Sequence, residues 1–205
     1  MLRLWFIIAL VFIVGVVATI NYFSAKQEAK NSTPIVTVIS KPQTGTPQLG
    51  GHFSLTDQHG VPRTDADFKG KYQLIYFGYA FCPDICPMAL SHITQALKIL
   101  GNKAEQVTPI FITVDPGRDN VEQLAVYVQN FHPSLVALTG TEQQVKQAKQ
   151  AFKVYSSKVE EKGTTDYLVD HTSIIYLMDR QGKFVTHFNH ETTPSVIADT
   201  LKSLL

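Results

Sequence analysis

The chain has two cysteines, Cys82 and Cys86, and they lie four positions apart among 205 residues. On one helix this spacing separates two residues by about 40° around the axis, so both sulfurs can face one small ligand or close a disulfide bridge. Residues 73–79, just before the pair, are typical of a buried strand, and Met88 to Leu100 has the apolar spacing of a helix. The pair is therefore expected in a strand-to-helix turn, where the helix N-terminus favours thiolate over thiol.

Three uses of such a pair are open: a redox dithiol, a site for a soft metal, and a structural bridge. The structural bridge is the least favoured of the three. A disulfide that closes so short a loop removes little entropy from the unfolded chain, and a chain of this length buries a core without one.

The N-terminal segment predicts a membrane anchor. Residues 4–20 carry no charge, Trp5 lies near one end of this run, and Tyr22 and Phe23 lie near the other, where interfacial aromatic residues are expected. The alternative is a cleaved signal peptide, but no good small-x-small site follows the apolar stretch. We therefore expect a transmembrane helix in residues 1–25 that is not removed.

The rest of the chain divides into a linker and one domain. Residues 26–51 are rich in Ser, Thr, Pro, Gln and Gly, as in a tether, and 52–205 has the size of one domain. The net charge is +1 and the basic residues form no run, so a nucleic-acid partner is not expected.

Strand and helix patterns alternate along this domain. We expect strands at 53–57, 61–63, 73–79, 107–114, 135–138, 153–159, 172–178 and 183–188, and helices at 88–100, about 120–130, 142–152 and 194–205. A β-α-β half followed by β-β-α, with two cysteines after the first central strand, predicts an α/β domain of the thioredoxin-like fold. The Cys-x-x-x-Cys motif is one residue longer than that of the thioredoxin-like redox enzymes.

Five blocks of sequence are similar to the Sco/SenC family of copper chaperones for cytochrome oxidase assembly. The blocks are 53–60, 76–87, 111–116 with Arg118 and Asp119, 138–141, and 167–172. The resemblance covers essentially the whole domain, and it implies a thioredoxin-like fold in which Cys82, Cys86 and His171 hold one copper. Thr172, where serine is common, and Ala80, where threonine or a similar residue is common, depart from the family pattern without touching a ligand.

The chemistry of these three side chains is consistent with copper. Two thiolates and one imidazole make a soft site of low coordination number that suits Cu(I) and accepts Cu(II) with an added ligand. A structural zinc site normally has a fourth protein ligand, for which Asp84 and Asp170 are the nearest candidates in sequence, so zinc is disfavoured.

The remaining candidates have weaker signals. His171, without the resemblance, is typical of a surface histidine, and His92 is expected to point away from Cys86 on the helix. A second metal site at His187 and His190 is less favoured than two exposed histidines. Asp84 lies between the cysteines, where three roles are open: it tunes their pKa, it contacts a partner, or it is simply an aspartate favoured near a helix start.

For Asp115, which precedes Pro116 in a turn, we expect a capping role.

Together these patterns predict a membrane-anchored metallochaperone that delivers copper to the copper centre of cytochrome c oxidase. The alternative is a thiol-disulfide reductase that uses Cys82 and Cys86 to keep the cysteines of that centre reduced, and a peroxidase is less favoured. The expected partners are the copper-binding oxidase subunit, other periplasmic copper carriers or thiol reductants, and the membrane. We expect a single pass through a bacterial plasma membrane, with the domain on the extracytoplasmic side.

Overall fold

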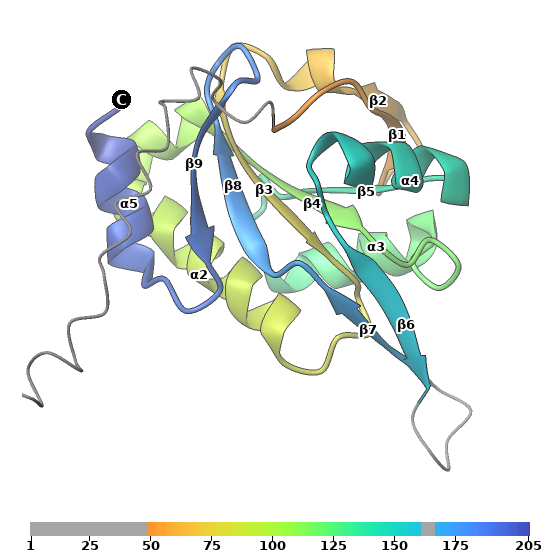
Figure 1. The fold of residues 1–205 in the computed structure, drawn as a ribbon. Coiled ribbons are helices and arrows are strands. Elements are labelled where there is room, and N and C mark those ends of the chain that lie inside the picture. Colours follow the sequence, from red (N-terminus) through yellow and green to blue (C-terminus); the bar gives the residue numbers. More distant parts are fainter. Residues whose placement is uncertain (1–48, 161–166) are drawn as a thin grey trace, which may run out of the picture. The chain divides into compact units, whose positions relative to one another are not determined.

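The computed structural model of the chain describes residues 49–160 and 167–205, and a mixed seven-stranded sheet forms its centre (Figure 1). Its strands are β1 (Ser54–Asp57), β2 (Pro62–Thr64), β3 (Tyr72–Gly78), β4 (Val107–Thr113), β5 (Val136–Thr139), β8 (Ile174–Met178) and β9 (Phe184–Asn189). They are ordered β2-β1-β5-β4-β3-β8-β9. The β3–β4 and β4–β5 pairs are parallel, and the other pairs are antiparallel.

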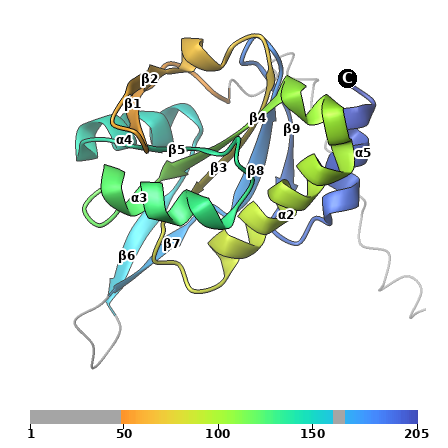
Figure 2. The same cartoon turned by 180° about the vertical axis from the view of Figure 1, so that it is seen from behind.

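Helices cover both faces of this sheet. They are α2 (Ile85–Leu100), α3 (Val121–Tyr127), α4 (Glu142–Ala151) and α5 (Pro194–Lys202), with short 3-10 turns at Asp65–Phe68, Gly101–Gln106 and Val128–Asn130. Helices α2 and α3 lie in front of the sheet in Figure 2, α4 lies on the opposite face, and α5 packs against α2. Because both faces are covered, β3 is a continuous buried run from Gln73 to Gly78, as central parallel strands require.

The predicted thioredoxin-like fold is confirmed. Strand β3 lies between its parallel partner β4 and its antiparallel partner β8, so the β3-α2-β4 and β8-β9-α5 units share one sheet. The β1–β2 and β8–β9 hairpins lie where the turn residues predicted them. Helix α4 begins with a capping box between Thr141 and Gln144, and α5 begins with Pro194 in its first turn.

Helix α2 begins at Ile85, three residues before the predicted start, and this changes the relation between the cysteines. Cys86 lies in its first turn, whereas Cys82 precedes the N-cap residue Asp84. The pair therefore lies in the predicted strand-to-helix turn, with only Cys86 inside the helix, and the loop that enters the helix brings the two sulfurs together.

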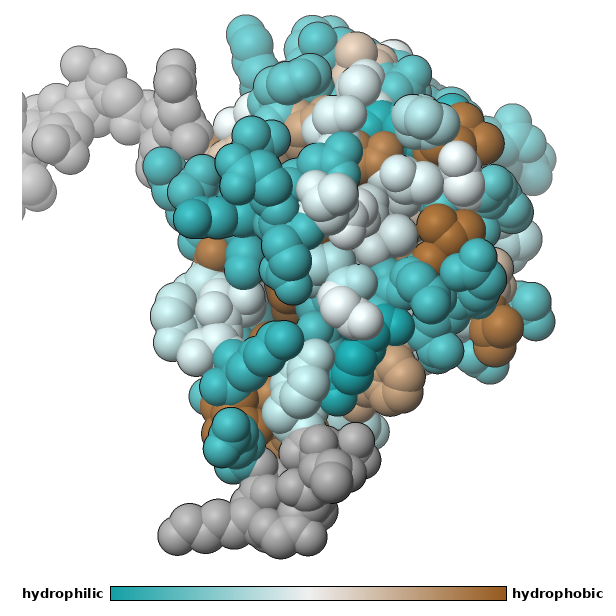
Figure 3. Space-filling view, turned by 90° about the vertical axis from the view of Figure 1, so that its right-hand side faces the viewer, coloured by the Kyte–Doolittle hydropathy of each residue, from teal (hydrophilic) through white to brown (hydrophobic). Residues whose placement is uncertain are grey.

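A two-stranded ribbon, β6 (Ser156–Glu160) and β7 (Tyr167–His171), forms a separate antiparallel sheet. Strand β6 was expected, although it begins three residues later than predicted, whereas β7 was not. The ribbon extends from the lower right of the domain in Figure 1. Its apolar side chains Val159 and Leu168 are exposed. Figure 3 shows that brown, hydrophobic surface is scattered among teal, hydrophilic surface on one face of the molecule.

In the part of the chain that the structure describes, no helix is both long and apolar enough to cross a membrane. The anchor predicted in 1–25, and all of the predicted tether except residues 49–51, lie outside the described residues.

Candidate metal centre

The loop that carries Cys82 follows the carboxyl end of β3 and is held by a buried carboxylate. The backbone N–H of Ala80 donates a hydrogen bond to Oδ2 of Asp119 at 3.0 Å, and the hydroxyl of Thr113 donates to the same oxygen at 2.6 Å. Asp119 is fully buried, and burial raises the pKa of its carboxyl group to about 6. A buried acceptor that receives two donors is a firm anchor for a loop, because losing either bond would leave a polar group unpaired.

The sulfur of Cys82 takes the place of a helix cap. Asp84 is the N-cap residue of α2, but its side chain makes no capping hydrogen bond. Instead, the backbone N–H of Cys86 donates to Sγ of Cys82 at 3.4 Å. The half-buried sulfur thus lies at the positive end of the helix dipole, where negative charge is stabilised.

Cys86 is fully buried behind Cys82, in a space that exists only because residue 78 is glycine. A Cβ atom on Gly78 would lie 2.9 Å from Sγ of Cys86 and 2.9 Å from a ring carbon of Tyr76, closer than real Cβ contacts. The hydroxyl of Tyr76 donates to the Cys86 sulfur at 3.8 Å. The end of β3 therefore sets both the position and the hydrogen bonding of this sulfur.

His171, the last residue of β7, reaches Cys86 from the ribbon. Its Nε2 lies 3.3 Å from Sγ of Cys86, and its Nδ1 lies 3.2 Å from the backbone carbonyl oxygen of Thr172. When Nδ1–H donates to this carbonyl, the lone pair is on Nε2 and faces the sulfur. The rings of Tyr76 and Tyr79 contact the imidazole edge-on, with centroids 6.1 and 5.9 Å away, and limit its rotation.

The two cysteines are inequivalent acids. The hydrogen bond from Cys86, followed by contributions from His171 and from the amides of Asp84 and Cys86, lowers the pKa of Cys82 despite opposing burial. The same bond to Cys82, together with burial, raises the pKa of Cys86. Cys82 is therefore the stronger acid of the pair, and Cys86 is the thiol that keeps its proton more tightly.

The donor set is that of a soft metal. Two ligand atoms bound at roughly 2.3 Å (sulfur) and 2.0 Å (nitrogen) to one tetrahedral ion lie about 3.5 Å apart, close to the separation of Cys86 and His171. Even so, no group of three or more His, Cys, Asp or Glu side chains in 49–160 and 167–205 is already arranged around an ion. Cys86 lies against both Cys82 and His171, and His171 also lowers the pKa of Cys82, so the three predicted ligands are neighbours that a metal would have to draw closer together.

The structure does not bring the other predicted donors to this place. Asp84 is exposed, and Asp170 is on the opposite face of β7 from His171 because side chains alternate along a strand. Neither carboxylate therefore completes a four-ligand zinc site in the described residues. His187 is exposed and stacks on Phe184.

Sequence reasoning missed a long-range role of Asp115. Its buried carboxylate is paired with Arg118 and accepts hydrogen bonds from the Tyr167 hydroxyl at 2.8 and 3.0 Å, in addition to the local turn bonds that were expected. The only sequence signal for Arg118 and Tyr167 was their place in the blocks of family resemblance.

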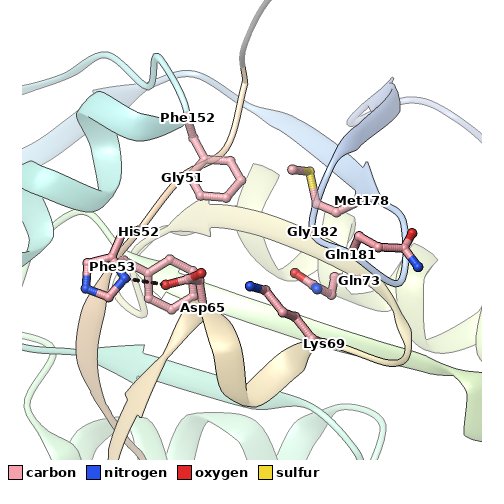
Figure 4. A pocket seen from close by; sticks show the side chains of 10 residues that line it. All are labelled: Gly51, His52, Phe53, Asp65, Lys69, Gln73, Phe152, Met178, Gln181 and Gly182. Carbon is pink, nitrogen blue, oxygen red and sulfur yellow. Dashed lines mark hydrogen bonds and ion pairs between the residues drawn. The ribbon is translucent and has the colours of Figure 1, made fainter.

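A hollow of about 210 Å³ lies elsewhere, at the start of β3, and Figure 4 shows its lining. Gln73 contributes to it, whereas the cysteine loop follows Gly78 at the other end of the strand. His52 and Asp65 form a hydrogen bond at its rim, with Nδ1 2.6 Å from Oδ1. The hollow is therefore not part of the candidate metal centre.

The protein is therefore a thioredoxin-like domain of the class that combines two cysteines at the end of the central strand with a distant histidine against one of them. The chain belongs to the SCO1/SenC family, whose sequence profile matches residues 41–205. It is 46% identical over 162 residues to Protein sco1 of Schizosaccharomyces pombe, covering 78% of this chain and 62% of that protein's length.

Solved structures of related proteins agree. Copper-bound ScoI of Bradyrhizobium japonicum has a TM-score of 0.72 and 44% identity, covering 77% of this chain and 99% of that one. BsSco is described as having a disulfide switch and as a member of the Sco family of cytochrome c oxidase assembly proteins. It has a TM-score of 0.59 and 26% identity, covering 75% of this chain and 90% of that one.

Proposed function

We propose that this protein binds one copper ion through Cys82, Cys86 and His171 and delivers it to the copper centre of cytochrome c oxidase. The observation that carries the proposal is the 3.3 Å separation between Sγ of Cys86 and Nε2 of His171. A dithiol that only exchanges disulfides does not require an imidazole at its buried sulfur. Two sulfurs and an imidazole are, by contrast, a ligand set for Cu(I), with room for Cu(II) if a further ligand is added.

The relatives support copper as the cargo. Copper is bound in the Bradyrhizobium japonicum structure, and BsSco is named as belonging to a family of oxidase assembly proteins. The loop around Cys82 also suits the role, since half of the dithiol is accessible to a partner protein while Cys86 stays buried.

Loading copper requires the loss of one proton from the resting site. The pKa of Cys82 is lowered and that of Cys86 is raised, so the proton to be released is that of Cys86, which its thiol donates to the Cys82 sulfur. Copper binding then replaces this proton and satisfies both the sulfur and the imidazole. The third ligand is on a separate ribbon, so it can leave without opening the main sheet during transfer to the oxidase subunit.

The second candidate function is reduction of a disulfide in the oxidase copper site. The lowered pKa of Cys82 favours it, because the thiolate is the attacking form. Attack would form a mixed disulfide with the target, and Cys86, after losing its proton, would attack Sγ of Cys82 to release the reduced target. The two electrons come from the Cys82–Cys86 pair, which ends as a disulfide and needs an external thiol reductant before another cycle.

Copper binding by the full-length protein in detergent distinguishes these functions. The reduced protein should bind one copper per chain, His171→Ala should bind it more weakly or with altered spectra, and Cys82→Ser and Cys86→Ser should lose both copper binding and dithiol exchange. His187→Ala is the matched control, since His187 is exposed and stacks on Phe184. If His171→Ala supports oxidase assembly fully in copper-limited cells while the cysteine variants do not, the reductase function replaces the chaperone function.

The membrane placement is also part of the proposal. Residues 1–25 would form a single transmembrane anchor in a bacterial plasma membrane, 26–51 a tether, and 52–205 the copper-binding domain outside the cytoplasm. A dithiol switch is useful there because the cytosol keeps thiols reduced. A reporter that works only in the cytosol, fused after Leu205, should be inactive, and full reporter activity would refute this orientation.

A further inference from the structure

The β6–β7 ribbon places three side chains of β7 on the face toward the domain. Tyr167 and His171 are half-buried and Val169 is buried, while Leu168 and Asp170 are exposed between them. Within residues 49–160 and 167–205 the ribbon has no strand pairing with the main sheet, so the contacts of this inner face help to set its orientation. His171 is therefore positioned by whatever holds Tyr167 and the ends of the ribbon.

Arg118 holds the outer end of β7. Its Nη1 donates a hydrogen bond to the backbone carbonyl of Tyr167 at 3.0 Å, and its guanidinium carbon lies 3.7 Å from the centroid of the Tyr167 ring. Its Nε donates to Oδ2 of Asp115 at 2.5 Å, and Asp115 in turn accepts the Tyr167 hydroxyl. We call this closed set of three residues, Arg118, Asp115 and Tyr167, the Arg118 clamp.

A second set of hydrogen bonds holds the end of the ribbon next to His171, which we call the inner end. The backbone N–H of Thr172 donates to the carbonyl of Tyr155 at 3.0 Å, and the backbone N–H of Tyr155 donates to the Thr172 hydroxyl at 3.1 Å. His171 lies beside this end, and Tyr167 is about 13 Å away along the strand. Without the clamp, the ribbon would stay attached at Thr172 and could turn about that end.

The guanidinium also contacts the cysteine loop. Its carbon lies 5.1 Å from the ring centroid of Phe81 and 5.6 Å from that of Tyr79, the residues just before Cys82. Cation–π contacts at this distance favour one arrangement of the loop relative to the cation. One side chain thus joins the segment that carries Cys82 to the strand that carries His171. The two segments also meet at His171, which contacts both cysteines, and at Tyr79, which is hydrogen-bonded to the backbone of Val169.

We propose that Arg118 is a positioning residue for copper binding: through the Arg118 clamp it holds the β6–β7 ribbon so that the imidazole of His171 stays within reach of the Cys86 sulfur. This inference rests on the proposed function, because it concerns the affinity of the same three ligands. Arg118 itself does not touch the proposed copper ligands. In this proposal it does not touch the copper ion either.

The test is a double-mutant cycle in the full-length protein in detergent, with Cu(I) affinity measured against a chromophoric chelator. Arg118→Gln should weaken copper binding roughly 10- to 100-fold, the range typical of residues that orient a metal-binding histidine. In the His171→Ala background the same change should have no further effect on affinity, because the ligand that the clamp positions is already gone.

Two further variants separate positioning from loss of stability. Arg118→Gln removes the nearer of the two cations beside the buried Asp115 carboxylate and leaves only Lys158, with Nζ 4.0 Å from Oδ1, so it is expected to destabilise the protein. Tyr167→Phe is the milder variant, because it removes only the hydroxyl that donates to Asp115. Arg63→Gln is the matched control, because Arg63 forms the same kind of pair, at 2.8 Å, with the buried Asp57 at the far edge of the sheet. Arg63→Gln should leave copper affinity unchanged.

A measurement without copper completes the design. In the copper-free protein, amide hydrogen exchange of residues 167–171 should be faster in Arg118→Gln and Tyr167→Phe than in the wild type or Arg63→Gln, while exchange in β3 and β4 should be unchanged. Equal exchange in all four proteins overturns the inference. So does a loss of copper affinity by Arg118→Gln that is equally large with and without His171. If instead the wild-type protein binds no copper, the proposed function fails, and hydrogen exchange alone decides whether the clamp exists.

Discussion

The Sγ atom of Cys86 lies 3.3 Å from Nε2 of His171, although 85 positions separate the two residues in the chain. Cys86 belongs to the first turn of α2, and His171 ends a strand of the separate ribbon. This sulfur is also the one that would close a bridge with Cys82. Under the proposed function it therefore has two competing partners, a second sulfur on oxidation and a metal shared with the imidazole on reduction.

Oxidation of Cys82 and Cys86 to a disulfide should abolish copper binding, and reduction should restore it. A copper ligand must be a thiolate, and a disulfide sulfur no longer has that charge. Copper per chain should be measured on protein oxidised and then reduced, with the thiol count checked by mass spectrometry. Equal affinity of the oxidised and reduced forms would show that the sulfurs are not ligands.

Alkylation by iodoacetamide should modify Cys82 first and should hardly slow between pH 8 and pH 6. An ordinary cysteine, with a pKa of about 8.5, loses nearly all of its thiolate over this range. The hydrogen bond from Cys86 lowers the pKa of Cys82, whereas the pKa of the buried Cys86 is raised, so Cys86 should stay protected.

Cys86→Ala provides the control for that measurement, since it removes the largest cause of the shift. The reactivity of Cys82 should then fall at pH 6 relative to pH 8. If both proteins show the same steep dependence on pH, Cys82 does not rest as a thiolate.

Asp119→Asn should make the protein more stable at pH 7 and should flatten the dependence of its stability on pH. Burial raises the pKa of Asp119 from its ordinary 3.8 to about 6, so the folded state holds this proton more tightly than the unfolded state does. The resulting stabilisation is full below pH 3.8 and is lost as the pH rises through about 6. A shift of this size corresponds to about 3 kcal/mol.

Denaturant unfolding of the copper-free protein at pH 4 to 7 measures this difference. Asp57→Asn is a control of opposite sign: despite opposing burial, hydrogen bonds from Val61, Arg63 and His59 lower the pKa of Asp57. The stabilisation from Asp57 is therefore present above its ordinary pKa and is lost as the pH falls through the lowered value. If the wild type and Asp119→Asn have parallel stability profiles, the buried carboxyl group does not titrate in this range.

Gly78→Ala should both destabilise the protein and weaken copper binding. The added methyl group would lie 2.9 Å from Sγ of Cys86 and 3.0 Å from a ring carbon of Phe111, so the sulfur, a ring or the strand must move. Overpacking of this kind costs about 1–3 kcal/mol. Gly60→Ala is a useful comparison, because a Cβ atom there meets nothing within 4 Å and only its positive φ of 77° causes strain. Unfolding and copper titrations of both variants should show a loss of copper affinity in Gly78→Ala alone.

Much of the fold follows from the sequence alone, because local periodicity reports which face of an element is buried. The apolar run of β3 predicts a central strand, the 3.6-residue spacing of Leu90, Ile93, Leu97 and Leu100 predicts α2, and all of these side chains are buried. The turn between these two elements places the cysteines at the end of the strand. The ribbon strand β7 was missed, since five residues with only one buried side chain give too weak a signal.

Tertiary structure decided how the site is assembled. The sequence placed Cys82 and Cys86 at one turn, but the fold put Cys82 outside the helix. It also lowered the pKa of one thiol and raised that of the other, because burial and hydrogen bonds depend on neighbours. The spacing of residues says nothing about His171, which family resemblance alone singled out. His171 contacts Cys86, and Arg118 contacts Tyr167, only when segments far apart in the chain pack together. No local pattern in a single sequence encodes which distant segments will meet.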